Sequence, residues 1–317
     1  IPEGLLKSKN GCLEIKLTEP MEEVAYLDSA RLKAYDLPQG WSMVLDERMG
    51  ILGPAPTGKP VFYRREVLPV KAINDRNKDV TPFIVKQDLK AAPVGKIDHR
   101  FIGMLENDHV LTLTFENRLD GFTGQPVLMA EGWVEYPYSQ TSFAAWQAGA
   151  TYNAPTVEIK GPDGKWKVLL EQFGYPAGMP RPMSVPLPKL PTGTRELRIR
   201  TNQEIYWDRI SVVFAEPCPG VEARELPLTL ARIEIVGYPE RPDLPKRLPY
   251  YDFERRKPLW DTRLLEGYYT KFGRVDELVE AKDNALAIFG AGEGIHLEFR
   301  ALPPSPSKTA KRVYVLE

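Results

Sequence analysis

Prolines and glycines interrupt this chain so often that they limit what it can fold into. The 317 residues include 30 prolines and 24 glycines, spread over the whole length. Proline removes a backbone donor and clashes with the preceding helical turn, so few stretches are left for long helices. The segments between the prolines alternate apolar and polar residues, which predicts half-buried β-strands. We therefore expect an all-β, mainly antiparallel fold with little helix.

The alternating segments are short and are separated by turn-forming residues. The clearest cover residues 13–17, 30–35, 110–115, 127–136, 156–159, 166–170, 197–201, 205–214 and 228–236. Residues 161–164 (GPDG) and 290–294 (GAGEG) read as hairpin turns. Helical spacing is confined to residues 275–282 and 141–147. This pattern favours tandem β-sandwich or jelly-roll modules over a parallel α/β sheet.

The length predicts two or three domains. We expect a partial β-sandwich and linker at residues 1–97 and a central, jelly-roll-like β-sandwich at residues 98–238. Residues 239–317 are expected to form an extended proline-rich segment followed by a C-terminal hairpin. Because Ile1 is not an initiator methionine, we expect the chain to be part of a longer polypeptide.

Charge and cysteine content exclude several classes of protein. The formal net charge is -1, whereas nucleic-acid binding needs a basic excess that displaces counterions. No apolar run approaches the ~20 residues of a membrane span. Cys12 and Cys218 are too few for a cysteine zinc cluster. Two free thiols are the expected state, and one long-range disulfide is the alternative.

A Tyr-x-Asp pattern occurs twice, at Tyr26 with Asp28 and at Tyr206 with Asp208. Each follows one alternating segment and opens another, as duplicated sandwich domains would produce; chance similarity between β-segments is the alternative. We assign these four residues structural roles. An aspartate at a strand start accepts backbone N–H bonds, and a structural calcium is the alternative.

Strand alternation makes a sharper prediction for Asp208. It places Tyr206, Asp208 and Ile210 on one face of the strand. A carboxylate beside apolar neighbours is partly desolvated, which is costly unless it accepts hydrogen bonds. We expect Asp208 to accept them from the backbone of a neighbouring loop.

Catalytic and cofactor signatures are missing from the sequence. There is no G-x-S-x-G or H-E-x-x-H motif, and residues 290–294 are one residue short of a dinucleotide fingerprint and precede a strand. Glu131 and Glu135 share one strand face, but a glycosidase pair must also flank a cleft. His99 and His109 are more typical of surface histidines than of a metal site. We predict no catalytic residues, no metal and no cofactor.

One aromatic region is the best candidate for a contact surface. Flat aromatic faces beside amide and hydroxyl groups suit a sugar or a protein hot spot. The alternative is that these aromatic side chains close one end of the sandwich. The candidate ligand-binding residues are Trp133, Tyr136, Tyr138, Gln140, Trp146 and Tyr152.

Four segments carry a family resemblance: residues 132–136 (GWVEY), 144–149 (AAWQAG), 174–180 (GYPAGMP) and 201–210 (TNQEIYWDRI). Together they resemble the C-terminal region of large bacterial FG-GAP repeat proteins of the ASPIC/UnbV, CRTAC-like group. The resemblance implies an exported, extracytoplasmic protein with a β-propeller upstream and an adhesive or assembly role. It supplies no catalytic residues, and this chain contains no FG-GAP calcium loop.

From these observations we expect tandem β-sandwich modules with a galactose-binding-like centre. The expected function is non-catalytic binding or scaffolding, through contact with a partner protein or a glycan. One alternative is a carbohydrate-binding module or accessory domain of a glycoside hydrolase. The other is a structural subunit of a surface assembly.

Overall fold

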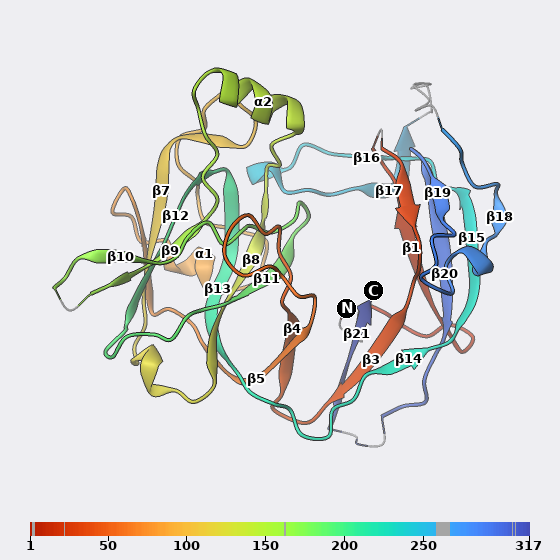
Figure 1. Cartoon of the computed structure of the whole chain (residues 1–317), viewed down its shortest axis with the longest axis horizontal. Helices are drawn as coiled ribbons and strands as arrows, with labels where there is room; N and C mark the ends of the chain where they lie inside the picture. Colours follow the sequence, from red (N-terminus) through yellow and green to blue (C-terminus); the bar gives the residue numbers. More distant parts are fainter. Residues whose placement is uncertain (2–3, 22, 162, 258–266, 306, 308) are drawn as a thin grey trace. The chain divides into compact units, whose positions relative to one another are not determined.

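The structure is a computed structural model that describes the chain apart from residues 2, 3, 22, 162, 258–266, 306 and 308. Its described part consists mainly of antiparallel β-ladders, with two short α-helices, α1 (Thr81–Ile84) and α2 (Ser139–Gln147) (Figure 1). The predicted all-β class is confirmed. Neither of these two helices has the length or apolar character that crossing a membrane would require.

The chain divides into two compact units, and neither is continuous in sequence. The smaller unit comprises residues 1–40, 219–242 and 251–317, and the larger comprises residues 41–218 and 243–250. This division differs from the consecutive ranges 1–97, 98–238 and 239–317, because strands near the two ends of the chain pair with each other. In the smaller unit, β1 (Cys12–Thr18) pairs with β20 (Glu293–Arg300), and β3 (Leu32–Leu37) pairs with β21 (Lys311–Leu316).

The larger unit contains two five-stranded sheets. The order of the first is β10 (Trp166–Leu170), β9 (Thr156–Lys160), β12 (Glu196–Gln203), β7 (Met104–Thr114) and β6 (Lys71–Asn74). The order of the second is β11 (Arg181–Pro186), β8 (Gln125–Val134), β13 (Ile205–Ala215), β5 (Pro60–Val67) and β4 (Ser42–Leu45).

The two sheets of the larger unit share one core. Alternate residues of β7 and β12, such as Leu113 and Leu197, are buried in the same cluster as Leu128 and Val212 from β8 and β13. This period-2 burial is the physical consequence of the alternation seen in the sequence. The unit is therefore a β-sandwich.

Strand β13 needs hydrogen-bond partners on both edges. It pairs with β8 along its whole length, but β5 reaches it only from Val212 onwards. Residues 85–92 take the place of β5 beside the first half. Val85 forms an isolated bridge with Arg209, and the amide N of Ala92 donates to the carbonyl O of Trp207 at 2.7 Å. A loop segment thus completes the sheet.

A β-bulge interrupts β13 at Asp208, because Trp207 pairs with Gly132 while Arg209 pairs with the adjacent Glu131. Gly132 is required there, since an added Cβ would collide with the carbonyl of Tyr206. The extra residue reverses the alternation. Trp207 and Ile210 both face the core between the sheets, whereas Tyr206 packs on the outer face with Trp133. The prediction that Tyr206, Asp208 and Ile210 share one face is therefore wrong.

Asp208 is only 2% exposed. Its Oδ1 accepts the backbone N–H of Asp88 at 3.4 Å, and the N–H groups of Leu89 and Lys90 also hydrogen-bond the carboxylate. Burial raises the pKa of Asp208, and these backbone hydrogen bonds act against the rise. This is the geometry that the structural hypothesis for Asp208 requires, with residues 85–92 as the loop.

In the smaller unit, too, two sheets pack around a shared hydrophobic core. Its four-stranded sheet has the order β1, β20, β15 (Leu228–Ile235) and β18 (Gly273–Arg274), and its three-stranded sheet has the order β14 (Arg224–Leu226), β3 and β21. The core joins both sheets through residues such as Leu13, Leu32 and Phe299. Two further pairs are β16 (Tyr238–Glu240) with β17 (Asp252–Lys257), and β19 (Ala287–Phe289) with β2 (Ala25–Leu27).

The Tyr-x-Asp copies differ in structure. Tyr26 lies 63% exposed in the three-residue strand β2, and Asp28 follows that strand in a bend, where it accepts the backbone N–H groups of Asp283 and Asn284. Tyr206 and Asp208, by contrast, are buried in an eleven-residue strand. The two copies therefore do not occupy the equivalent positions that duplicated domains would produce.

Three local predictions have mixed outcomes. Strands β9 and β10 pair as the predicted hairpin at 161–164 requires, and the N–H of Gly164 donates to the carbonyl O of Gly161 at 2.9 Å, although residue 162 lies outside the described residues. The turn at 290–294 does not close a hairpin, because β19 pairs with β2 while β20 pairs with β1 and β15. Residues 275–282 contain only a 3₁₀ turn at Asp276–Leu278. Cys12 and Cys218 are free thiols, as expected.

We expect Asp208→Ala to lower the free energy of unfolding by about 1–3 kcal/mol, because the N–H groups of residues 88–90 would lose their acceptor. Asp208→Asn should cost less, since its amide oxygen still accepts and the site already disfavours the charged carboxylate. Urea denaturation of both variants measures the difference. Equal stability of Asp208→Ala and the unchanged chain would show that the carboxylate does not hold this loop.

Candidate functional site

The connection between β8 and β9 exposes aromatic side chains of the larger unit. Trp146 is 71% and Phe143 57% exposed on α2, and Tyr136 and Tyr138 just before the helix are 41% and 40% exposed. Phe143 and Trp146 are three residues apart, so they share one helix face. Their ring centroids lie 5.6 Å apart with an interplanar angle of 28°. Tyr136 and Tyr138 pack edge to face at 6.1 Å.

Helix α2, which carries this surface, is anchored through its buried side. Ala145 is buried in a cluster with Phe101 and Met104. The hydroxyl of Tyr152 donates to the carbonyl O of Ile102 at 2.7 Å, and the Oγ1 of Thr141 accepts the N–H of Ile102 at 3.2 Å. The loop at 101–104 therefore anchors both the helix and the segment that follows it.

Two glycines shape this support. Gly149 has a φ of 74° and ends the helix, with its N–H donating to the carbonyl O of Trp146 at 3.0 Å. This left-handed position is the usual helix C-terminal cap, and it fixes Trp146 in the last turn. Gly103 has the same φ, and a Cβ there would collide with the carbonyl of Glu135. The aromatic side chains thus sit on a preorganised backbone.

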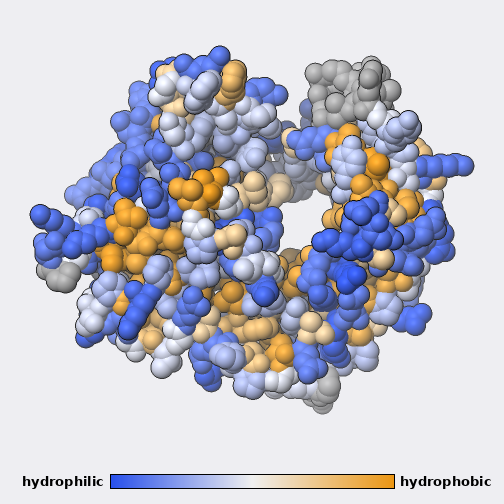
Figure 2. Space-filling view, viewed as in Figure 1, coloured by the Kyte–Doolittle hydropathy of each residue, from blue (hydrophilic) through white to orange (hydrophobic). Residues whose placement is uncertain are grey.

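This surface carries no charge of its own. From Tyr136 to Val157 the sequence contains no Asp, Glu, Lys or Arg, although 27% of the chain is charged. The exposed polar groups beside the rings include Gln140, whose Oε1 lies 3.1 Å from the Oγ of Ser139. Figure 2 shows pale and orange tones mixed with blue over α2. We name residues 136–147 the aromatic surface.

Trp133 does not belong to the aromatic surface, which corrects its assignment as a ligand-binding candidate. It is fully buried on the outer face of the second sheet, stacked on Tyr206 with centroids 5.7 Å apart. Its indole N–H donates to the carbonyl O of Lys246 at 2.8 Å. Tyr152 is half-buried and anchors the helix. Of the six candidates, the structure leaves Tyr136, Tyr138, Gln140 and Trp146 exposed together on one connection.

The carboxylates considered for hydrolysis are both engaged. Glu131 is buried and its Oε1 lies 3.2 Å from Nη1 of Arg209. Glu135 pairs with Arg247 at 3.3 Å. Burial raises the pKa of Glu131, while the Arg209 guanidinium opposes the rise. Each carboxylate thus faces its own arginine.

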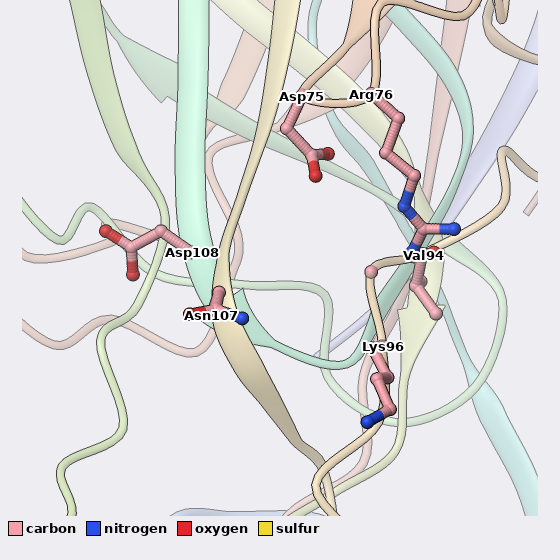
Figure 3. A pocket seen from close by; sticks show the side chains of 7 residues that line it. Asp75, Arg76, Val94, Lys96, Asn107 and Asp108 are labelled. Carbon is pink, nitrogen blue, oxygen red and sulfur yellow. Dashed lines mark hydrogen bonds between the residues drawn. The ribbon is translucent and has the colours of Figure 1, made fainter.

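A cavity of about 470 Å³ lies elsewhere in the larger unit (Figure 3). Arg76 and Lys96 lie on one side of it, and Asn107 and Asp108 lie on the other. Most of its charged groups already have partners: Lys96 pairs with Glu106, Asp108 with Arg200, and Arg76 donates to the carbonyl O of Val94. No aromatic ring lines it. The cavity offers mixed charge and no flat apolar face.

An apolar loop escaped the sequence prediction. Ile51 and Leu52 are each half-exposed in the uncharged run 49–58. Below them, the fully buried guanidinium of Arg48 donates to the carbonyls of Phe173, Ser184 and Pro54, and it pairs with Asp46 at 2.6 Å. The uncharged run was the signal in the sequence that could have indicated this exposed loop. Strand alternation, on which the prediction relied, gives no information on exposed loop residues.

Comparison with known proteins gives no assignment. No protein-family model matches the chain, and no curated protein matches it. Among the described residues, no group of three or more His, Cys, Asp or Glu side chains is arranged to hold a metal ion.

His109 lies buried next to the cavity, and its Nδ1 is 2.5 Å from Oδ1 of Asp75. Burial lowers the pKa of His109, and nearby Arg76 adds to this, while Asp75 opposes it. Below the ordinary histidine pKa, about 6.5, the unfolded chain therefore binds a proton that the folded imidazole resists. Stability contributed by this residue is present above that pH and decreases as the pH falls toward the lowered value.

We expect His109→Gln to flatten the decline in melting temperature between about pH 7 and pH 5, because the variant has no imidazole to charge. Thermal melts across that range measure the slope. His99→Gln is the matched control, since His99 is exposed, and its profile should match that of the unchanged chain. A slope in His109→Gln as steep as the control's would contradict this interpretation.

Proposed function

We propose that this chain is a non-catalytic binding module and that its aromatic surface contacts a neutral glycan. The observation that carries the proposal is the pair Phe143 and Trp146, two large rings left exposed side by side on an anchored helix. Burial of such rings is normally favourable, so their exposure on a rigid support marks an interaction surface.

Neutral glycans fit the chemistry of this surface. A pyranose ring presents an apolar C–H face that packs on an aromatic ring, and a rim of hydroxyl groups that hydrogen-bond to amides and hydroxyls. The aromatic surface supplies rings together with Gln140, Thr141 and Gln147. Because no charged residue occurs from Tyr136 to Val157, these residues themselves do not select an anionic or cationic ligand.

The non-catalytic part of the proposal rests on the carboxylates. Glycoside hydrolysis requires two carboxyl groups that face the same scissile bond. Glu131 and Glu135 are each paired with a different arginine. Neither carboxylate is free on the aromatic surface, which supports binding without turnover.

The resemblance to exported FG-GAP proteins of the ASPIC/UnbV group supports an extracytoplasmic setting. We propose that the chain serves there as a C-terminal recognition module of a larger adhesive protein. In a β-sandwich, binding residues commonly lie on loops and connections that the rigid sheets hold in position. The position of α2 between β8 and β9 agrees with this proposal.

A protein partner is the second candidate, and the loop at residues 49–58 favours it. Ile51 and Leu52 present aliphatic rather than aromatic side chains, which suit a protein surface better than a sugar. The hydrogen bonds and the ion pair of Arg48 hold this loop in one conformation. A partner that engages this loop would lose affinity in Leu52→Ser and keep it in Trp146→Ala.

We expect Trp146→Ala to weaken binding to neutral glycans by about 30-fold, which corresponds to about 2 kcal/mol for loss of a tryptophan hot spot. The melting temperature should be unchanged because Trp146 is largely exposed. Affinity electrophoresis in gels containing neutral polysaccharides identifies a ligand, and isothermal titration measures the change.

Tyr26→Ala is the matched control, because Tyr26 is a similarly exposed aromatic residue in the other unit. It should bind as the unchanged chain does. Failure of every neutral polysaccharide to retard the chain would contradict the proposal, as would equal affinity of Trp146→Ala and Tyr26→Ala.

A further inference from the structure

Residues 243–250 (DLPKRLPY) pack on the outer face of the second sheet of the larger unit and belong to that unit. The 3₁₀ turn Pro245–Arg247 lies at its centre. Leu248, just after this turn, packs in a cluster with Ala91, Trp133 and Tyr206. A short, proline-flanked segment thus covers aromatic side chains that the sheet would otherwise expose.

Lys246 is held through both its side chain and its backbone. Its Nζ donates to the carbonyl O of Lys90 at 2.7 Å and to that of Ala91, and it lies 4.8 Å from the ring centroid of Phe83. Its own carbonyl accepts the indole N–H of Trp133. Two carbonyls and one aromatic face form a receptor for an ammonium group.

Arg247 enters an acidic site beside this receptor. Its Nε lies 2.8 Å from Oε1 of Glu204, and its Nη1 lies 3.3 Å from Oε1 of Glu135. The Glu204 side chain is fully buried and also accepts the hydroxyl of Tyr206 at 2.5 Å. Its second oxygen, Oε2, has no hydrogen-bond partner among the described residues. The site therefore has spare capacity to accept an N–H group.

The backbone of this segment is strained. Lys246 and Arg247 are consecutive non-glycine residues with φ of 57° and 51°. The left-handed region is energetically unfavourable for L-residues other than glycine. Such strain persists only when surrounding contacts impose it. The contacts that do so here are those of the two basic side chains and of the Lys246 carbonyl.

From these contacts we infer that the outer face of the sandwich carries a second binding site, specific for a dibasic Lys-Arg peptide, and that residues 243–250 fill it as a ligand in cis. The site consists of Glu135, Glu204, Trp133, Phe83 and the carbonyls of residues 90 and 91. A ligand held in the same chain has an effective concentration of about millimolar. A peptide added in trans therefore competes only when the internal segment is weakened.

The test uses the whole chain and a labelled synthetic peptide of residues 243–250. We expect the variant Lys246→Ala/Arg247→Ala to bind this peptide saturably in fluorescence anisotropy, and the unchanged chain to bind it at least about tenfold more weakly. A peptide with alanines in place of its Lys-Arg pair should not bind. Adding Glu204→Gln to the double variant should weaken binding about tenfold, because the arginine loses its charged partner.

A double variant that keeps the melting temperature of the unchanged chain but does not distinguish the two peptides would overturn the inference. If the double variant does not fold, hydrogen exchange in the unchanged chain decides. Millimolar Lys-Arg peptide should accelerate exchange in residues 243–250, while the strands of the sandwich keep their protection. Unaltered exchange in that segment would show that it is a fixed part of the fold and not a displaceable ligand.

Discussion

Strand β13 is central to the larger unit because both of its edges must be satisfied over eleven residues. Strand β8 pairs with one edge of β13 along its whole length. The other edge pairs first with residues 85–92 and, from Val212 onwards, with β5. The bulge at Asp208 allows the change of partner, and Gly132 leaves room for it. A buried backbone group without a partner costs about as much as a lost hydrogen bond. The buried carboxylate of Asp208 is the partner of the N–H groups of residues 88–90, which explains why it stays in the strand.

The same bulge determines which way two large aromatic side chains of β13 face. It directs Trp207 into the core and Tyr206 outward, where Tyr206 stacks on Trp133 beneath residues 243–250. The exposed rings Phe143 and Trp146 lie on α2 instead. We propose two kinds of recognition on this one sandwich. The outer face holds basic side chains against buried carboxylates, and the α2 connection presents uncharged rings.

Local features were predictable from the sequence, and pairings between distant segments were not. Alternation identified several of the longer strands, such as β7, β8 and β13, and residues 141–147 marked α2. The burial of Trp133 depends on residues more than a hundred positions later, which no local pattern contains. The face of Tyr206 depends on one extra residue that alternation cannot count. The discontinuous units arise likewise from pairing between β1 and β20.

The proposed function requires that Trp146 touch the ligand and that the buried tryptophans do not. Fluorine NMR of the chain labelled with fluorotryptophan tests it directly, because each of the six tryptophans gives its own resonance. The Trp146 resonance is assigned by its loss in Trp146→Phe. Titration with a neutral oligosaccharide should shift this resonance saturably and leave those of Trp133 and Trp207 in place. A saturable shift of another tryptophan resonance, with that of Trp146 unchanged, would contradict the proposed function.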